Sequence, residues 1–413
     1  MAERTRNIWN DDDGEEEKKP KKHRKLKAFF LFLLVLVVVL GVVLVAAYRD
    51  GTGFDVLRRY FNYGKVEEVG GEVIYDYDAS VRNRFAALEN RLVVLSDTKL
   101  SILSPDGGEV WSETVNMTNP TLCAGGGRVA AYDIGGTELY VVDQQGELLH
   151  LTTDEEEPFI AATLNHDGWL AVTAEKKGRK GGVAVDDEEM ELVFELYSGN
   201  RFVTDAYVTD DDRYLAVVTL GQEENVFVSN MVLYDLTQEE PVADYSIKDG
   251  LVVDIAQQDD RLVTVSDTCL TFAGTDGTVL ATYPYDGLHL RAYDLEGSGF
   301  AALLLNRYQS GSVGQLVTVA PDGTTLASLD VTREVLDISA AGRYLAVLYT
   351  DSLVVYNPNL QVYASLSGTD FATGVLLRTD GSALLLSSES AGLFLPLAAE
   401  ITRKFINSLH TER

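Results

Sequence analysis

Three clusters of carboxylates come nearest, among the residues of this sequence, to a pattern that could perform chemistry. They are Asp154 to Glu157, Asp186 to Glu189 and Asp210 to Asp212. Hard cations such as Ca²⁺ are held by several carboxylate oxygens, but no cluster has the alternating spacing and the glycine of an EF-hand loop. We therefore interpret the clusters as solvated loop tips and predict no metal site.

Two glycine-containing segments suggest phosphate or cofactor binding. Gly125–Gly127 has the composition of a phosphate loop, but no Lys-Ser/Thr follows it and no helix begins there, which favours a hairpin turn. Asp106–Trp111 (DGGEVW) resembles one repeat of the quinone-cofactor propellers, although only this unit carries the tryptophan. No GxSxG, CxxC or HExxH motif occurs. We predict no catalytic residue, no cofactor and no enzyme activity.

Charge limits the kinds of partner. The chain has 34 basic and 64 acidic residues and a formal net charge of −30. Nucleic-acid binding needs a basic surface, so nucleic acid is not expected as a partner. The exception outside the N-terminus is a basic hairpin tip with Lys176, Lys177, Arg179 and Lys180. We interpret it as an exposed loop, and an anionic wall polymer is the ligand that its charge would suit.

The chain has two cysteines, Cys123 and Cys269. They fall in repeats that are not neighbours, so a disulfide between them is not expected. We interpret both as small buried apolar residues. An exported domain that does not depend on disulfides suits a bacterial surface.

A repeat positions these residues. A turn followed by a large residue and a short apolar run recurs along the chain, most clearly as DGWLAV at 167–172, DRYLAV at 212–217 and GRYLAV at 342–347. The apolar runs begin at 92, 129, 170, 215, 262, 301, 345 and 384, which gives a mean period close to 42. That period is typical of a four-stranded propeller blade.

Turn signals between the apolar runs divide each unit into hairpins. Examples are Pro105-Asp106-Gly107, Asp276-Gly277 and Pro321-Asp322-Gly323, whose residue types favour tight turns. No helix signal occurs between 66 and 396. We therefore predict four strands in each unit. A blade built in this way must stack on its neighbours to cover its two apolar faces.

We predict an all-β, eight-bladed propeller over 71–396. The last unit, 371–396, lacks about one strand, whereas the strand-like run 71–78 has no unit of its own. We expect this N-terminal strand to complete the C-terminal blade and close the ring. Seven blades are the alternative if the third unit, interrupted by Lys176–Gly182, is incomplete.

A run of 21 uncharged residues, Ala28–Tyr48, precedes the repeats. At about 1.5 Å per helical residue it would extend for about 30 Å, the thickness of a bilayer's hydrocarbon core. We predict a single transmembrane helix here. The side chains assigned to the anchor are Phe29, Phe30, Leu31, Phe32, Leu33, Leu34, Val35, Leu36, Leu40, Leu44 and Tyr48.

Basic residues before the apolar run predict its orientation. These topology-setting residues are Lys21, Lys22, Arg24, Lys25 and Lys27. The positive-inside bias keeps the N-terminus in the cytoplasm and places the propeller outside the cell membrane. A cleaved signal peptide is the alternative, since Val45, Ala46 and Ala47 would suit a signal peptidase. An uncleaved signal anchor is favoured because both the apolar run and its leader are long.

Three further segments lie outside the ring and the anchor. The leader 1–27 has no apolar face to bury and is expected to be disordered. Within 49–70, Phe54, Leu57 and Phe61 predict an amphipathic helix with Arg58 and Arg59 turned away, lying either at the lipid headgroups or on the propeller. The tail 397–413 predicts a short helix that either caps the ring or binds a partner.

This layout resembles a family of uncharacterised membrane-anchored β-propellers of Gram-positive bacteria. The resemblance covers 28–396, and its motif copies are YLAV at 214–217 and 344–347. It implies a fold, and it supplies no functional residue. The chain also resembles, at the level of fold alone, exported propellers that scaffold envelope assembly.

Together these patterns predict a membrane-anchored scaffold that binds an envelope protein or a wall polymer. The alternative is a ligand sensor or an enzyme that uses the central channel of the ring. Several ionisable side chains with perturbed pKa values, gathered at one mouth of the channel, would favour the alternative.

Overall fold

A computed structural model describes residues 29–38, 52–63, 69–247 and 250–396. The chain forms two units, Met1–Phe54 and Asp55–Arg413. In the first unit, residues 29–38 are helical with exposed side chains. The remainder of the predicted span 28–48 lies outside the described residues, as do the leader 1–27 and the predicted helix in 397–413. Within the described residues, no helix combines the length and the apolar character that crossing a membrane requires.

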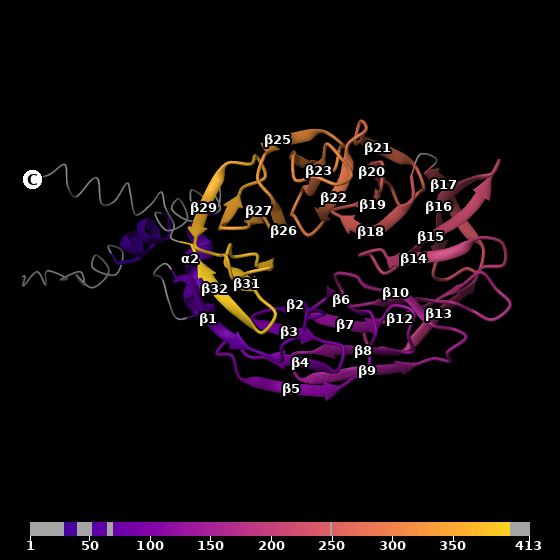
Figure 1. Ribbon diagram of the computed structural model, residues 1–413, viewed down its shortest axis with the longest axis horizontal. Helices are drawn as coiled ribbons and strands as arrows, with labels where there is room; N and C mark the ends of the chain where they lie inside the picture. The colour runs from indigo at the N-terminus through magenta and orange to yellow at the C-terminus, as the bar shows by residue number, and fades with distance from the viewer. Residues whose placement is uncertain (1–28, 39–51, 64–68, 248–249, 397–413) are drawn as a thin grey trace, which may run out of the picture. The chain divides into compact units, whose positions relative to one another are not determined.

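The second unit is built from eight four-stranded antiparallel sheets arranged around a centre (Figure 1). Blades 1 to 4 follow the chain. Blade 1 has β2 (Arg84–Leu88), β3 (Arg91–Leu95), β4 (Lys99–Leu103) and β5 (Glu109–Thr114). Blade 2 has β6 (Pro120–Gly125), β7 (Arg128–Asp133), β8 (Glu138–Asp143) and β9 (Gly146–Thr152). Blade 3 has β10 (Phe159–Leu164), β11 (Leu170–Ala174), β12 (Gly182–Asp186) and β13 (Leu192–Tyr197). Blade 4 has β14 (Phe202–Val208), β15 (Tyr214–Glu223), β16 (Val226–Asp235) and β17 (Pro241–Ile247).

The remaining blades complete the ring. Blade 5 has β18 (Val252–Gln258), β19 (Arg261–Ser266), β20 (Cys269–Ala273) and β21 (Val279–Pro284). Blade 6 has β22 (His289–Asp294), β23 (Ala301–Asn306), β24 (Gly314–Val319) and β25 (Thr325–Val331). Blade 7 has β26 (Val335–Ala341), β27 (Tyr344–Tyr349), β28 (Ser352–Tyr356) and β29 (Val362–Ser367). Blade 8 has β30 (Gly374–Leu377), β31 (Ala383–Leu386), β32 (Ser390–Leu395) and, as its fourth strand, β1 (Val69–Asp76).

The predicted count of eight blades is confirmed, and the seven-bladed alternative is wrong because the third unit has all four of its strands. The predicted closure is also confirmed. β1 pairs antiparallel with β32, from Val69 opposite Leu395 to Asp76 opposite Ser390. The two ends of the propeller sequence therefore share one sheet, so that opening the ring requires breaking this strand pairing.

The apolar core is divided into eight clusters, one between each pair of adjacent blades. The second strand of each blade contributes apolar side chains to the interfaces with both neighbouring blades. In β3, for example, Val93 and Leu95 pack towards blade 2, whereas Leu92 and Val94 pack towards blade 8. Because successive side chains of a strand point to opposite faces, a strand buried on both faces reads as an unbroken apolar run. This explains the apolar runs that mark the repeat.

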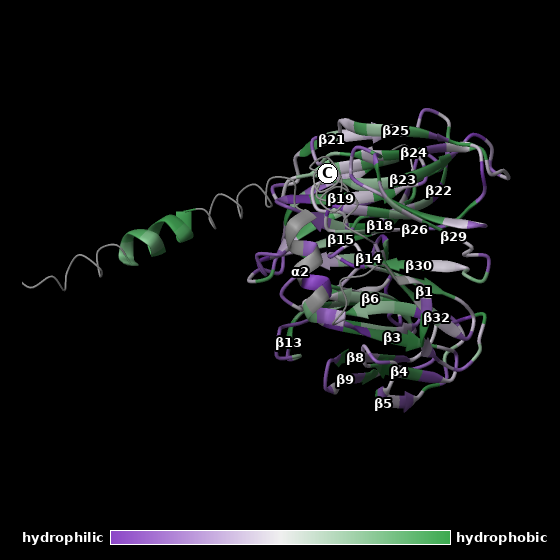
Figure 2. Ribbon diagram, turned by 90° about the vertical axis from the view of Figure 1, so that its left-hand side faces the viewer, coloured by the Kyte–Doolittle hydropathy of each residue, from purple (hydrophilic) through white to green (hydrophobic). Residues whose placement is uncertain are grey.

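The helix α2 (Thr52–Tyr63) lies on one side of the ring (Figure 2). It contacts the turns between the first and second strands of blades 7 and 8. Asp55 accepts hydrogen bonds from Arg343 and from the Tyr344 hydroxyl, Arg58 donates to Thr379 at 3.3 Å, and Tyr63 lies 3.0 Å from Ser382. We call this side of the ring the α2 face. The opposite side, which carries the connections between blades and the turns between second and third strands, is called the loop face.

The predicted orientation of α2 is wrong in one respect. Arg59 was expected to turn away from the packed side, but its side chain is buried, donating to the Pro396 carbonyl and, at 2.7 Å, to the Tyr363 hydroxyl. Phe61, in contrast, is 76 % exposed. Among the α2 side chains that the structure describes, Asp55, Arg59 and Tyr63 all form hydrogen bonds to polar groups of the propeller.

Candidate functional site

One of the three acidic clusters, Asp154 to Glu157, and the basic hairpin tip partly neutralise each other. In blade 3, Lys176 forms an ion pair with Glu157 at 3.1 Å and Lys177 pairs with Glu156. Lys180 lies over the ring of Phe202, 4.3 Å from its centroid. Among the described residues, no group of three His, Cys, Asp or Glu side chains is placed to hold a metal ion. The basic tip is therefore a loop largely engaged by its own blade and its neighbour.

The two glycine-containing segments have structural roles. Gly126 and Gly127 form the turn between β6 and β7, with φ values of +56° and +69°. A Cβ atom on Gly126 would lie 2.3 Å from the Gly168 nitrogen, so this turn packs directly against blade 3. Trp111 lies on the outermost strand of blade 1 and packs over Gly146 of blade 2, where a Cβ atom would be 2.8 Å from the indole Cδ1. The DGGEVW segment therefore contributes to the packing of blade 1 against blade 2.

The two cysteines are unbridged and have different surroundings. Cys269 on β20 is buried in the cluster between blades 4 and 5. Cys123 on β6 lines the central channel, and burial raises the pKa of its thiol to about 12. The prediction that both are buried and apolar in character is confirmed for Cys269. Cys123 is half-buried: it packs against the apolar cluster between blades 2 and 3 and also lines the cavity.

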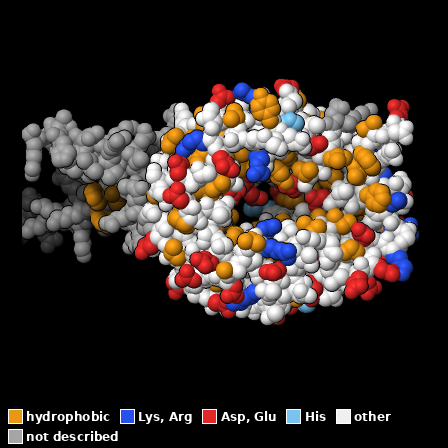
Figure 3. All heavy atoms as spheres, viewed as in Figure 1, with side chains coloured by type: hydrophobic (Ala, Val, Ile, Leu, Met, Phe, Trp, Pro, Cys, Tyr) orange, Lys and Arg blue, Asp and Glu red, His pale blue; other side chains and the backbone are white. Residues whose placement is uncertain are grey.

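A cavity of about 790 Å³ occupies the channel of the ring. It is lined by the first strands of blades 2 to 6, β6, β10, β14, β18 and β22, and by the turns that follow them. The loop face is hollowed at its middle, and both acidic and basic side chains can be seen around the hollow (Figure 3). The lining carboxylates are Asp205, Asp210, Asp254, Asp294 and Glu296, and no Lys or Arg is among the described lining residues.

The geometry of the inner strands places these carboxylates. β14 and β18 each have a register shift in their pairing with the next strand, immediately before Asp205 and Asp254 respectively. The inner strand is the edge strand of its blade, so the N–H groups on its channel side have no partner strand. Asp205 accepts a hydrogen bond from the Ala206 N–H and Asp254 from the Ile255 N–H, both at 2.8 Å. In blade 7, Asp337 repeats the arrangement with Ile338 at 2.9 Å.

Two of these acidic residues also join adjacent blades. Asp337 accepts a second hydrogen bond from the Val375 N–H of blade 8 at 2.9 Å. Asp294 accepts from the Ala340 N–H of blade 7 at 2.8 Å and from the Glu296 N–H at 2.8 Å. Burial raises the pKa of Asp294 to about 7 and that of Asp337 to about 6. These two carboxylates are part of the ring's structure.

The carboxylates of Asp205, Asp254 and Glu296 are differently engaged. Within the described part of the chain, the Asp205 carboxylate accepts a single hydrogen bond, from the Ala206 N–H. The Asp254 carboxylate accepts a second hydrogen bond, from the Tyr293 hydroxyl. Burial raises the pKa of Asp205 well above its ordinary value, and the nearby charge of Asp254 adds to the rise. Burial also raises the pKa values of Asp254 and Glu296. Such groups are costly to ionise until a cation approaches them.

Aromatic side chains complete the lining. Tyr132, Tyr207 and Tyr293 face the cavity, and the Tyr207 hydroxyl donates to Asp210 at 3.0 Å. Carboxylates together with tyrosine rings are the groups that bind an ammonium or guanidinium ion, the carboxylates by charge and the rings by their negative faces. The arrangement can therefore hold a cation without a metal-binding geometry.

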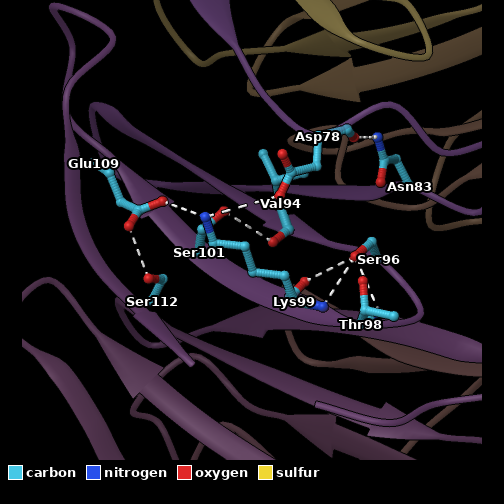
Figure 4. A network of polar contacts seen from close by, with 9 residues as sticks. All are labelled: Asp78, Asn83, Val94, Ser96, Thr98, Lys99, Ser101, Glu109 and Ser112. Atoms are coloured by element: carbon cyan, nitrogen blue, oxygen red, sulfur yellow. Dashed lines mark hydrogen bonds and ion pairs between the residues drawn. The ribbon is translucent and has the colours of Figure 1, made fainter. Parts of the chain in front are cut away.

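A second polar cluster lies between blades 8 and 1 on the loop face (Figure 4). Lys99 donates to Glu109 at 2.7 Å, and the Glu109 carboxylate accepts from Ser112 at 2.7 Å. The Asn83 amide donates to the carbonyl oxygens of Asp78 and Ser388, both at 3.0 Å. Its cavity measures about 130 Å³. The cluster holds the chain leaving β1 against blade 1 and serves closure of the ring.

The structure does not test the predicted anchor and topology residues, because most of the segment 21–48 lies outside the described residues. The channel residues, in contrast, were missed by the sequence reasoning. One signal was available: an Asp occurs on the first strand of blades 4, 5 and 7 at the same place before the turn, as TDA, VDI and LDI at 204–206, 253–255 and 336–338. The pattern is too short to distinguish from chance without the blade register.

Comparisons with solved structures agree with this fold. The chain is similar to BamB from Moraxella catarrhalis, with a TM-score of 0.51 and 13 % identity over 79 % of this chain and 99 % of that one. It is also similar to the C-terminal WD40 domain of Sif2, with a TM-score of 0.52 and 13 % identity over 80 % of this chain and 97 % of that one. At such identities the likeness concerns the fold alone.

Sequence comparison places the chain in a family. No curated protein matches it. A family model does, over residues 62–361, which cover β1, the six complete blades 1 to 6 and the first three strands of blade 7. The expected kinship with uncharacterised propellers is thereby confirmed at the level of family and fold. The chain belongs to the family of unknown function DUF5711.

Proposed function

We propose that this protein is a binding module of the cell envelope and that the central channel of its propeller binds a cationic group. The observation that carries the proposal is the channel cavity of about 790 Å³, whose described lining contains five carboxylates and no Lys or Arg. A volume of this size falls in the range of about 300 to 1,000 Å³ in which proteins bind small ligands.

Charge balance supports a cation as the ligand. The charge of Asp254 adds to the cost of ionising Asp205, and Glu296 experiences the charges of Asp254 and Asp210. An ammonium or guanidinium group in the cavity would reduce this repulsion and would form charge-assisted hydrogen bonds. The protein's net charge of −30 would attract such a ligand from a distance, more strongly at low salt.

Binding is proposed in preference to catalysis. In the described part of the chain, no Ser or Cys side chain is hydrogen-bonded to a histidine, and the Cys123 thiol has a pKa raised to about 12. Asp294 is committed to backbone N–H groups of two blades. These features suit a preformed receptor for charge better than a nucleophile with its base. The same geometry suits a ligand sensor that responds to the bound cation.

The location is also a proposal. The uncharged run Ala28–Tyr48 and the basic residues Lys21, Lys22, Arg24, Lys25 and Lys27 support a single span with the propeller outside the cell. The envelope of a Gram-positive bacterium is the setting that the layout favours. Protease added to intact cells should degrade the propeller and leave the leader protected. Complete protection of the propeller would contradict this location.

The channel proposal is tested by calorimetric titration of the full chain, in detergent micelles, with spermidine. Binding should weaken about tenfold or more in the variant Asp205→Asn/Asp254→Asn, since charged hydrogen bonds contribute about 1.5 to 3 kcal/mol each. The control is Asp260→Asn, whose side chain is 93 % exposed on a turn of the α2 face. Equal binding by both variants, or no binding to the unaltered protein, would contradict the proposal.

A further inference from the structure

The hairpin of β15 and β16 extends beyond its blade. Each strand has ten residues, and they pair as far as Glu223 opposite Val226, with a turn of Glu224 and Asn225 at φ values of 49° and 67°. The flanking strands end earlier, since β14 pairs only to Leu220 and β17 only to Ser229. Residues 221–228 therefore form a two-stranded ribbon that projects from the loop face.

Apolar side chains are exposed on this ribbon and beside its base. Phe202, Val226, Phe227, Leu251 and Val253, which we call the blade 4–5 patch, are between 42 and 62 % exposed, with Lys180 of blade 3 lying over the Phe202 ring. The Val252 N–H donates to the Ser229 hydroxyl at 3.0 Å, so blade 5 lies against the base of the ribbon. Single exposed apolar residues are ordinary, but five at one junction of two blades mark an interaction surface.

The patch leads directly into the acidic channel. Val253 belongs to the patch and also lines the cavity, and the next residue along the chain is Asp254. On β14, Phe202 is followed by the buried Val203 and then by Thr204 and Asp205, which line the cavity. An occupant that fills both regions must therefore present apolar side chains beside a positive charge.

We propose that the loop face binds a cationic segment of a partner protein, with apolar side chains of the segment on the blade 4–5 patch and a Lys or Arg side chain in the channel. This inference rests on the proposed function, because it assumes that the channel accepts a cation. Charge complementarity selects this occupant, since the channel is acidic and the protein carries a net charge of −30.

The arrangement divides the roles of the two regions. Exposed aromatic and aliphatic anchors at the centre of an interface carry most of the binding energy, whereas charges guide the approach and fix the orientation. A free polyamine would use the channel alone. A second copy of this chain would bring another body of the same strong negative charge to the face, which long-range repulsion opposes.

The test uses the full chain in detergent micelles and three probes. The first is a capped pentapeptide, Leu-Lys-Phe-Lys-Leu; the second has glutamine in place of both lysines; the third is spermidine. Fluorescence anisotropy of the labelled peptides and calorimetry with spermidine give the affinities. The patch variant is Val226→Ser/Phe227→Ser, and the control is Val362→Ser, a residue 63 % exposed on the outermost strand of blade 7.

The lysine peptide should bind at least tenfold more tightly than the glutamine peptide. The patch variant should weaken the lysine peptide at least fivefold and leave spermidine binding unchanged, while the control changes neither. If the patch variant binds the lysine peptide as well as the unaltered protein does, this inference is overturned and the cation site remains. If no probe binds, the proposed function fails with it. If sedimentation shows a dimer that the patch variant dissociates, the patch is an interface between copies of the chain, and the inference is overturned.

Discussion

Arg343 of blade 7 donates a hydrogen bond to the carboxylate of Asp55, 288 residues earlier in the chain. In blades 2 and 5, the Arg that precedes the apolar run donates instead to carbonyl oxygens in the turn between the third and fourth strands of the following blade: Arg128 to Glu188 at 2.5 Å and Arg261 to Pro321. Blade 8 has no tight turn between its third and fourth strands, because its fourth strand is β1. Asp55 of α2 supplies the acceptor that the absent turn would have provided.

Replacement of this arginine should weaken ring closure. Arg343→Ala leaves the buried Asp55 carboxylate without its cation, and the loss of one partner of a largely buried pair costs on the order of 3 kcal/mol. Thermal denaturation of the full chain should therefore show a clearly lower midpoint.

Arg213→Ala is the matched control for this change. Arg213 stands at the same place in the repeat, before Tyr214, but its side chain is 61 % exposed, and the buried Asp235 carboxylate that it contacts at 3.2 Å also accepts two hydrogen bonds from Thr237. Its loss should cost less than about 1 kcal/mol. Equal midpoints for the two variants would show that α2 does not hold the ring.

A glycine in the closing blade should not tolerate a larger side chain. A Cβ atom on Gly392 would lie 2.6 Å from the backbone oxygen of Gly71 in β1. We expect Gly392→Ala to destabilise the fold by about 1 to 3 kcal/mol, because the clash is with backbone that cannot move aside without breaking the strand pairing. Urea titration followed by circular dichroism measures the effect.

Gly70→Ala provides the comparison within the same strand pair. At that position a Cβ atom meets only the Leu366 Cδ1 at 3.4 Å. The substitution should be close to neutral. If it destabilised the protein as much as Gly392→Ala, close approach of β1 and β32 would not explain the result.

Stability should increase on acidification from pH 8 to pH 5. The pKa of Asp294 is raised to about 7 and that of Asp337 to about 6, from an ordinary value of 3.8, so between these values the folded state holds more protons than the unfolded state. The free energy of unfolding then falls as pH rises from about 4 to about 7. The thermal midpoint should be higher at pH 5 than at pH 8.

Neutral variants should reduce this pH dependence. Asp294→Asn and Asp337→Asn should each shrink the difference between the midpoints at pH 5 and pH 8, whatever their effect at a single pH. Asp322→Asn, on an exposed turn where hydrogen bonds from Thr324 lower the pKa, should leave the difference unchanged. A midpoint that rises steadily from pH 5 to pH 8 would contradict the assignment.

Cys123 can report the charge of the channel. In a Cys269→Ala background, a methanethiosulfonate reagent with a trimethylammonium group should modify Cys123 at least tenfold faster than one with a sulfonate group, because the cavity concentrates cations. Both rates should be low relative to a free thiol, since burial raises the pKa of Cys123 to about 12. Mass spectrometry measures the rates.

Removal of the channel carboxylates should abolish the preference between the reagents. Asp205→Asn/Asp254→Asn should bring the two rates closer together, and the Asp260→Asn control should not. A sulfonate reagent that reacts as fast as the ammonium reagent with the unaltered lining would show that the channel has no net negative field.

The fold could be predicted in some detail because its signals are local. Each apolar run, such as Tyr344–Tyr349, shows burial on both faces, and each turn has residues that specify it. The incomplete last unit and the unassigned strand-like run before the first unit together predicted the pairing of β1 with β32. The docking of α2 through Arg59 could not be foreseen, because the surface that accepts it comes from blades 7 and 8 and the end of β32.

Periodicity in the residues therefore determined how many blades there are, how each is built and which strand closes the ring, since every blade packs mainly on its neighbours along the chain. The acidic channel depends on three-dimensional closure. Asp205, Asp254 and Glu296 belong to three different blades, and each stands where an inner strand is irregular or ends. Their mutual repulsion exists only after the sheets have curved into a circle, because only then do the inner edges of sheets far apart in the chain face one common space.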